Sequence, residues 1–413
     1  GYGANSILTG YYNPLPQLEH DKFTSASTSL IGLVYAELEL VKGLKLKTNY
    51  SLNNLITINR SFNNPYQAGG FSNNGSANRA TNTNKRTNWT NTLTYATTIA
   101  SQHSITALLG YENIYTENEG FGVTRQNLND RFFEDFAGSW ATISGSTGTF
   151  TENAFRSLFS NATYDFKKKY LLSGSFRRDG FSGLSEGNKY GNFYGFSGGW
   201  NISEESFFQG LPISSVISGL KLRASYGQVG NVNIGNYPSL DLYSVGTYAG
   251  LSATVAPSQT GNRNLQWETS KKTDFGFNVS FLNNRITLDV DYYKNNIDGM
   301  ILDALQAPSK GIPGNSITTN VGAMYNQGFE FEVDYKAINK GSFKWNIGFN
   351  LSNNKNRVTA LANSDADIWT SGLGTSNITR VGESIGAVYV VPTTGVNPAN
   401  GLRMYTNRND ETV

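Results

Sequence analysis

The chain has 413 residues, a net charge of +2 and no cysteine, and only 15% of its residues are charged while 13% are aromatic. The near-neutral balance excludes a strongly basic nucleic-acid-binding surface, and the lack of cysteine excludes thiol catalysis, thiolate-bound zinc and disulfides. No apolar run approaches the roughly 18 residues of a membrane-spanning helix, and the first residues lack the basic start and apolar core of a signal peptide.

The first half of the chain predicts paired strands joined alternately by tight turns and by long polar loops. Strands are expected at 28–40, 44–58, 89–98, 103–115, 158–166 and 170–177. Tight turns are expected at 41–43, 99–102 and 167–169, and long loops at 63–85 and 117–153. This alternation of short and long connections is typical of outer-membrane barrels.

The second half continues the pattern. Strands are expected at 192–200, 220–228, 274–282, 285–297, 320–335 and 343–351, so the chain predicts about twelve strands. The segment 203–219 joins two of them, and a long loop is expected at 229–268.

Residues 274–297 form the clearest predicted hairpin, with a two-residue turn at Asn283-Asn284. Apolar residues alternate with polar ones on both strands; the apolar set is Phe275, Phe277, Val279, Phe281, Ile286, Leu288, Val290 and Tyr292. Because strand side chains alternate between two faces, one face of this hairpin is apolar and the other is polar and charged.

Two fold classes fit this alternation. A soluble β-sandwich would bury the apolar face against a second sheet, whereas a transmembrane barrel would turn it toward lipid. The loop asymmetry and the Tyr and Trp residues at strand ends favour an all-β, antiparallel transmembrane β-barrel, with short turns on one rim and long loops on the other. We expect a barrel rather than an open sheet because only closure removes unpaired strand edges in lipid. Neither end of the chain reads as a terminal strand, so we expect the chain to form about twelve strands of a partial barrel.

Charged residues on the polar parity are the first candidate site. A Lys or Arg at the membrane midplane costs about 2–4 kcal/mol on the lipid side, so these residues should face the lumen. They are Lys45, Lys47, Arg177, Lys221, Arg223, Asp289, Asp291, Glu330, Glu332 and Asp334. They could pair with one another and contact a plug, or line a solute path.

Aromatic residues among Asn, Ser and Thr in the expected loops are the second candidate site. They are Tyr66, Phe71, Phe121, Phe132, Trp140, Tyr237, Tyr243, Tyr248 and Trp369. Aromatic faces with amide and hydroxyl groups suit sugar rings or peptides, and they equally suit packing against a partner protein.

Other motifs carry little chemistry. The G-x-S-x-G pattern at 195–199 lies inside an alternating strand, whereas a nucleophile elbow needs a strand-to-helix turn. His20 and His103 stand far apart in the sequence, so we expect no catalytic, cofactor-binding or metal-binding residues. Arg178 with Asp179, near the long-loop rim, could bind lipid phosphates or cap the rim.

Several strings resemble the SusC/RagA family, the TonB-dependent outer-membrane transporters of Bacteroidetes. They are YLLSGSFRRDGFS (170–182), NFYGFSGGWNISEESFF (192–208), LKLRASYGQVGN (220–231), the segment 262–296 and VGESIGAVYVVPTTGVNPANG (381–401). The resemblance extends in order over nearly the whole chain.

The resemblance implies a barrel of about 22 strands with a plugged lumen, of which residues 1–413 are expected to be the middle part, without the plug and the final strands. It implies active import of glycans or peptides, with a SusD-like surface lipoprotein, the TonB complex, outer-membrane lipid and the solute as partners. The balanced charge separately argues against nucleic acid as a partner. A structural or adhesive barrel that binds ligands through its loops is the alternative function, and an enzyme is disfavoured by the two distant histidines.

Overall fold

The computed structural model describes residues 14–66, 68–130, 132–248, 251–371 and 376–407. The chain divides into two compact units. Unit 1 comprises residues 1–94, 109–158 and 180–182, and unit 2 comprises residues 95–108, 159–179 and 183–413.

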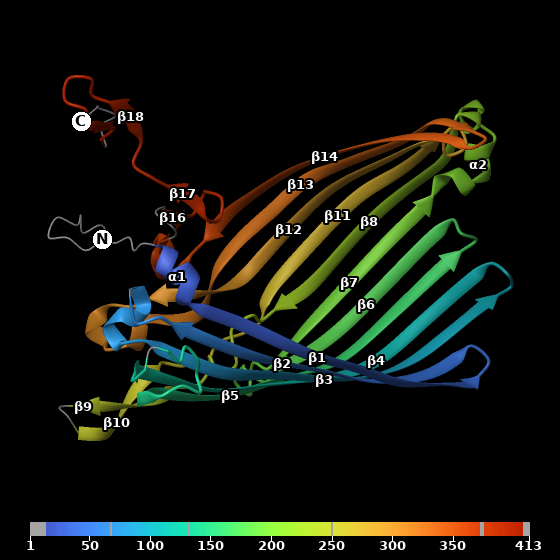
Figure 1. The fold of residues 1–413 in the computed structure, drawn as a ribbon. Helices are drawn as coiled ribbons and strands as arrows, with labels where there is room; N and C mark the ends of the chain where they lie inside the picture. Colours follow the sequence, from blue (N-terminus) through green and yellow to red (C-terminus); the bar gives the residue numbers. More distant parts are fainter. Residues whose placement is uncertain (1–13, 67, 131, 249–250, 372–375, 408–413) are drawn as a thin grey trace. The chain divides into compact units, whose positions relative to one another are not determined.

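Twelve long strands form one antiparallel sheet in the order β1-β2-β3-β4-β5-β6-β7-β8-β11-β12-β13-β14 (Figure 1). Their bounds are β1 (Lys22–Val41), β2 (Leu44–Asn63), β3 (Ser76–Ile99), β4 (His103–Leu128), β5 (Trp140–Phe166), β6 (Tyr170–Phe181), β7 (Tyr190–Asn201), β8 (Ile217–Asn231), β11 (Glu268–Phe281), β12 (Ile286–Leu305), β13 (Ser316–Lys340) and β14 (Phe343–Ala360). Within the described residues the sheet is not closed, since β1 and β14 are its end strands. The predicted partial antiparallel barrel of about twelve strands is thereby confirmed.

Smaller elements occupy the connections. One two-stranded sheet pairs β9 (Leu242–Tyr248) with β10 (Leu251–Gln259), and another pairs β18 (Thr393–Val396) with β19 (Arg403–Tyr405). A three-stranded sheet has the order β15 (Ile368–Ser371), β16 (Ser376–Thr379) and β17 (Ala387–Tyr389). The helices are α1 (Pro14–His20), α2 (Ser206–Gln209) and α3 (Ala362–Asp365), with 3₁₀ turns at Ala68–Asn73, Ile202–Glu204, Pro212–Ser215, Pro308–Lys310 and Pro313–Asn315. No helix in the described ranges has both the length and the apolarity to cross a bilayer.

In unit 2 the strand register aligns side chains into rows that run across the sheet. One row carries Trp200, Leu222, Phe277, Val290, Phe331 and Leu351. The neighbouring row carries Asn201, Lys221, Asn278, Asp289, Glu332 and Asn350. We call the side of the first row the apolar face and that of the second the polar face. A shift of one residue in any strand would exchange them, so the alternating pattern fixes the register.

The apolar face lacks a covering layer of protein in the described residues. Phe275 and Phe329 are 55% and 59% exposed, and Phe331 is 36% exposed. A soluble sandwich would bury these rings, so their exposure supports the prediction that this face meets lipid.

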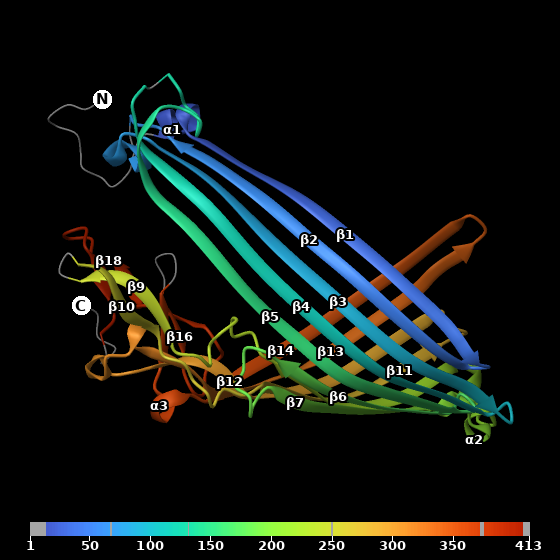
Figure 2. The same ribbon diagram turned by 90° about the horizontal axis from the view of Figure 1, so that it is seen from below.

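The connections of unit 2 differ at the two ends of its strands. Figures 1 and 2 show the β11–β12 and β13–β14 turns and α2 at one end, and β9, β10 and β16 at the other. The expected tight turn at 167–169 is present between β5 and β6, with positive φ at Lys167 and Lys168. The turn after β11 is longer than expected: residues 282–285 lie outside both strands, and Leu282, Asn283 and Asn284 all have positive φ.

Several strands extend far beyond their predicted ends. β4 continues to Leu128 and β5 begins at Trp140, so the expected loop at 117–153 shrinks to 129–139. The expected loop at 229–268 contains the β9–β10 hairpin. Residues 117–128 and 140–153 have polar side chains on both parities, so the apolar–polar alternation that predicts a strand is weak there.

A small hydrophobic cluster lies in unit 1, where the 129–139 loop meets the ends of β2, β3 and β4. Phe62, Ala77 and Leu128 are almost completely buried, and Phe136 and Trp140 pack against them. These packing contacts hold the 129–139 loop against β2, β3 and β4.

Candidate functional site on the polar face and the long loops

The polar face of unit 2 holds a charged network centred on Arg223. Its Nη2 donates to Asp291 Oδ2, and its Nε donates to Asn278 Oδ1 at 3.2 Å. Asp274 Oδ1 lies 3.9 Å from Arg223 Nη1, and Asp274 Oδ2 lies 3.8 Å from Lys272 Nζ. Adjacent strands β8, β11 and β12 position all these groups, so the network is a product of register.

Gly276 makes the Arg223–Asp291 contact possible. It stands between the two residues in register, opposite Arg223 on β8 and opposite Asp291 on β12. A Cβ at this position would lie 2.1 Å from Asp291 Oδ1 and 2.9 Å from Arg223 Cζ. Asp291 Oδ1 is itself buried and has no hydrogen-bond partner among the residues that the structure describes. The glycine therefore leaves the space through which the guanidinium reaches the carboxylate.

Carboxylates face one another on β12 and β13. Asp291 is directly opposite Glu330, and Asp289 is directly opposite Glu332. Asp289 accepts from Asn278 Nδ2, whereas Glu330, Glu332 and Asp334 are exposed and make no ion pair within the described residues. Like charges opposite each other on a sheet are destabilising, so this strip can gain free energy from a hydrogen-bonding or cationic partner.

The three lysines of the first candidate set lie outside this network. Lys45 Nζ pairs with Glu37 Oε1 at 3.2 Å in unit 1. Lys47 Nζ lies 5.2 Å from the centre of the Tyr35 ring. Lys221 extends along β7, where a Cβ at position 199 would approach its Cε to 3.3 Å.

The arginines near the end of β6 divide between two contacts. Arg177 Nε donates to Asp179 Oδ1 at 2.6 Å, and its guanidinium lies 5.2 Å from the Phe159 ring. Arg178 instead lies 4.8 Å from the Tyr190 ring. Residues i and i+2 of a strand share a face and adjacent ones do not, so Arg177 rather than Arg178 pairs with Asp179. That Arg178 with Asp179 binds lipid phosphates or caps the rim stays a prediction.

Most aromatic residues of the second candidate set are highly exposed. The exposed fractions are 68% for Phe71, 61% for Phe121, 85% for Phe132, 65% for Tyr243, 52% for Trp369 and 40% for Tyr66. Trp369 contacts Tyr389 edge to face, at 4.7 Å between ring centres. Exposed rings in this number can contact a solute or a partner protein.

Some of these residues are placed differently from expectation. Phe121 lies on β4, Trp140 begins β5, Tyr243 lies on β9 and Trp369 lies on β15, so none of them is in an irregular loop. Trp140 packs against Phe62, with the ring centres 6.2 Å apart, which gives it a structural contact. The Tyr237 carbonyl accepts from Gln259 Nε2 at 2.9 Å. The side chain of Tyr248 lies outside the described residues.

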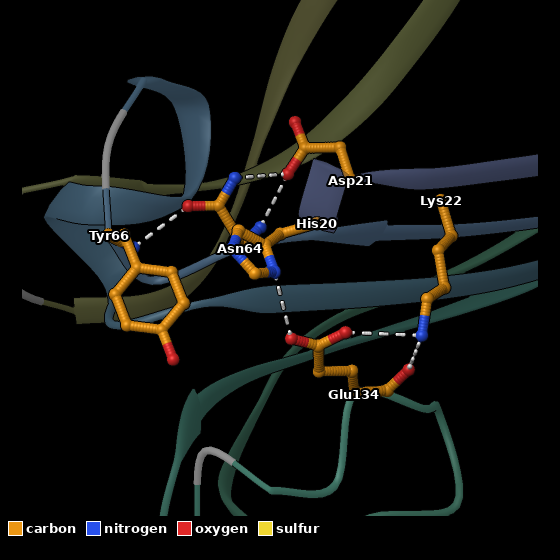
Figure 3. Close-up of polar contacts among 6 residues, drawn as sticks. All are labelled: His20, Asp21, Lys22, Asn64, Tyr66 and Glu134. Atoms are coloured by element: carbon orange, nitrogen blue, oxygen red, sulfur yellow. Dashed lines mark hydrogen bonds and ion pairs between the residues drawn. The ribbon is translucent and has the colours of Figure 1, made fainter. Parts of the chain in front are cut away.

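A rim cluster that the sequence did not reveal joins α1, β1, β2 and the 129–139 loop in unit 1. Figure 3 shows its members, which are His20, Asp21, Lys22, Asn64, Tyr66 and Glu134. Glu134 Oε2 lies 3.2 Å from Lys22 Nζ, and Glu134 Oε1 lies 3.4 Å from His20 Nδ1. The Asn64 backbone N–H and Nδ2 both donate to Asp21 Oδ1, at 2.7 and 2.6 Å. No local pattern could have indicated this cluster, because 112 residues separate Lys22 from Glu134.

A second unexpected cluster surrounds Glu205, between the 3₁₀ turn at Ile202–Glu204 and α2. Its carboxylate accepts from the Tyr170 hydroxyl at 2.6 Å, Lys169 Nζ at 2.9 Å and Trp200 Nε1 at 3.3 Å. The Tyr170 hydrogen bond, with the Lys169 ammonium, lowers the pKa of Glu205 from 4.5 to about 2. This cluster fixes the β7–β8 connection to the start of β6.

The remaining motifs have structural surroundings. Ser197 of the G-x-S-x-G pattern lies in the middle of β7, and its hydroxyl is 2.7 Å from that of Ser173. No strand-to-helix elbow forms there. His103 begins β4, with its Nδ1 at 2.8 Å from the Tyr164 hydroxyl.

Known proteins resemble the chain over most of its length. The sequence model of the family described as "TonB dependent receptor-like, beta-barrel" matches residues 2–404. TonB-dependent receptor P39 of Formosa agariphila is 31% identical over 387 residues, which are 93% of this chain and 36% of that protein. TonB-dependent receptor SusC of Bacteroides thetaiotaomicron is 29% identical over 262 residues, which are 62% of this chain and 25% of that protein.

A solved structure has the same arrangement of strands. The RagAB peptide importer in its "open-open" state matches with a TM-score of 0.83 and 25% identity, over 96% of this chain and 43% of that one. The chain thus spans less than half the length of the relatives it matches. The matching family, the SusC and RagAB relatives and the open apolar face agree with the fold described above. The chain belongs to the TonB-dependent receptor β-barrel family and is of the SusC/RagA type, located in the outer membrane.

Proposed function

We propose that the chain forms part of the barrel wall of an active outer-membrane importer of glycans or peptides. The observation that carries this proposal is the pairing of an open apolar face with a charged polar face on the same strands of a TonB-dependent receptor barrel. Lys or Arg facing lipid costs about 2–4 kcal/mol at midplane. The polar face is therefore the side that meets water, solute or a plug.

The polar face has groups that suit a hydrophilic cargo. Glu330, Glu332 and Asp334 are exposed carboxylates that accept hydrogen bonds from hydroxyl, amide or ammonium groups. The Arg223–Asp291 pair lies beside them and supplies guanidinium donors. A surface with both donors and acceptors can contact sugars and peptide backbones in many orientations without holding any one firmly.

The exposed aromatic residues support capture at the long-loop rim by stacking on the apolar faces of sugar rings or on peptide side chains. The same rings suit contact with a SusD-like surface lipoprotein that closes over the loops. The structurally similar RagAB protein is a peptide importer, and this likeness keeps peptides beside glycans as candidate cargo here.

Energy for import would come from the TonB complex acting on a plug. The chain contributes the wall against which such a plug moves, and the cargo is transported without a covalent change. The ten charged residues predicted from the sequence are proposed to contact the plug and the passing solute.

Uptake by cells tests this function. The natural gene for the full-length protein would be deleted and restored, and entry of labelled oligosaccharides and oligopeptides would be followed with and without a protonophore. We expect uptake of one class to be lost on deletion, restored on complementation and abolished by the protonophore.

Two results would contradict the proposal. Equal uptake by deleted and restored cells would exclude import as the function. Retained surface binding of the label without entry under energised conditions would favour an adhesive barrel. In a further experiment, affinity purification of the full-length protein through a tag would show whether a surface lipoprotein is purified with it.

A further inference from the structure

A groove of about 900 Å³ opens along the strands β6, β7, β8, β11, β12 and β13 of unit 2. The side chains in its lining include Leu172, Trp200, Leu222, Phe275 and Tyr292. These five side chains belong to the apolar face, and the groove is also bordered by Arg223 and Gly276, whose charged network lies on the polar face of the same strands. The apolar face of an outer-membrane barrel is covered by lipid, and the occupant of the groove is therefore sought among lipids.

Two small residues, Gly198 and Ala224, create the groove. Gly198 and Ala224 are directly opposite each other in register, and their row continues through Phe275, Tyr292 and Phe329. The apolar surface therefore falls from three large rings to a methyl group and a bare backbone within one row. The rings form one wall of a depression whose floor is the β7–β8 pair.

Neither conformation nor crowding requires glycine at position 198. Its φ lies outside the left-handed region, and a Cβ there would meet only Leu172 Cδ2, at an ordinary 3.7 Å. Glycine weakens a strand and often marks a site where another molecule approaches the backbone closely. Gly198 therefore indicates an occupant that lies against the β7 backbone.

One end of the groove has free positive charge. Tyr170 lines the groove and directly follows the turn 167–169 between β5 and β6. In this turn the Lys169 ammonium is paired with Glu205, but Lys167 and Lys168 are exposed and have no ion pair within the described residues. The Lys167 ammonium lies 5.2 Å from the Phe166 ring, at the level of Tyr170 and Trp200. Rings of this kind mark the membrane–water interface in transmembrane barrels.

The position of the turn identifies the class of lipid. Short turns of outer-membrane barrels lie on the periplasmic side, where the leaflet consists of glycerophospholipids. We propose that one such phospholipid is bound here, with an acyl chain in the groove over Gly198 and its phosphate at Lys167 and Lys168. The site needs only the outer-membrane location of the chain and does not depend on its transport function.

Native mass spectrometry of the full-length protein tests the site. Delipidated protein would be titrated with dioleoylphosphatidylglycerol or with dioleoylglycerol, which has the same acyl chains and no phosphate. We expect Gly198→Leu to fill the groove and weaken binding of both lipids about tenfold, which corresponds to about 1.4 kcal/mol. The double variant Lys167→Gln/Lys168→Gln should weaken binding of the phospholipid alone.

Matched controls make the result specific. Gly32→Leu places the same side chain on the apolar parity of β1, where a Cβ meets nothing within 4 Å. Lys42→Gln/Lys340→Gln removes two exposed lysines elsewhere, one in the β1–β2 turn and one at the end of β13. Both controls should bind the lipids like the unaltered protein, and the heat-dependent gel shift of a folded barrel should be present in every variant.

Three outcomes would overturn the proposal. They are unchanged phospholipid binding in Gly198→Leu, equal losses in test and control variants, and a loss in the lysine variant without a loss in Gly198→Leu. The last outcome would mean general attraction of anionic lipid to the turn and no acyl-chain groove.

Discussion

The Tyr170 hydroxyl donates a 2.6 Å hydrogen bond to Glu205, which ties the first residue of β6 to the connection between β7 and β8. The same carboxylate accepts from Lys169 and Trp200. Three donors, from the β5–β6 turn, β6 and β7, therefore depend on one negative charge.

This dependence predicts a pH effect. Because the pKa of Glu205 falls from 4.5 to about 2 on folding, its ionised form stabilises the folded state fully above about pH 4.5, and this contribution is lost as the pH falls through about 2. We expect Glu205→Gln to be less stable than the unaltered protein above pH 4.5, and the difference to shrink toward pH 2. Unfolding midpoints of the full-length protein in detergent would measure it. Glu204→Gln, which alters an exposed neighbour, is the control, and a difference independent of pH would contradict the assignment.

Gly276→Ala should disrupt the charged network on the polar face. The new Cβ would lie 2.1 Å from Asp291 Oδ1 and 3.0 Å from the Val290 carbonyl oxygen, so strands or side chains must move. Overpacking of this kind costs about 1–3 kcal/mol, and we expect a lower unfolding midpoint in denaturant. Gly227→Ala, on the neighbouring strand β8 with nothing within 4 Å of its Cβ, should have almost no effect. Equal stability of the two variants would show that Gly276 is not needed for the pair.

Arg223 and Asp291 should be energetically coupled. Asp291 is 17% exposed and Arg223 is 34% exposed, so removing one partner leaves the other charge poorly solvated. We expect Arg223→Met and Asp291→Asn to destabilise the protein each by about 1–3 kcal/mol. The double variant should lose less than the sum, with a coupling of about 0.5–3 kcal/mol. A double-mutant cycle of unfolding free energies checks this, and strict additivity would exclude the interaction.

Phe62→Ala should loosen the 129–139 loop. Phe62 is 3% exposed and packs against Trp140, and truncating a buried Phe costs about 3–5 kcal/mol. We expect faster proteolytic cleavage within 129–139, because the loop loses the packing contacts that hold it against the strands. Phe132→Ala removes a ring that is 85% exposed in the same loop and should leave cleavage unchanged. If both variants were cleaved at the same rate, the buried cluster would not hold the loop.

The sequence predicted those features that lipid imposes. Alternation along 274–297 indicated the two faces correctly, and the register of Phe277 with Val290 and of Asn278 with Asp289 confirms them. The turn at 167–169 was also predicted correctly. These features are local, since a strand between lipid and water must alternate with a period of two.

The predictions that were wrong concern segments where this constraint is absent. Phe121 and Trp140 were expected in a loop, but they lie on β4 and β5 in segments without alternation. The contacts of Glu134 with Lys22 and of Glu205 with Tyr170 depend on pairing between distant strands, which neither composition nor spacing reveals. The roles of the ten charged residues and of the exposed aromatic residues in transport stay predictions.

The length of β5 has a mechanical consequence. It has 27 residues, whereas about 9–11 suffice to cross a bilayer, so the excess is equivalent to roughly 55 Å of strand at 3.3 Å per residue. A hairpin with that overhang holds its tip well clear of the crowded headgroup layer. Bulky polymers could then meet the tip in open water, away from the headgroups.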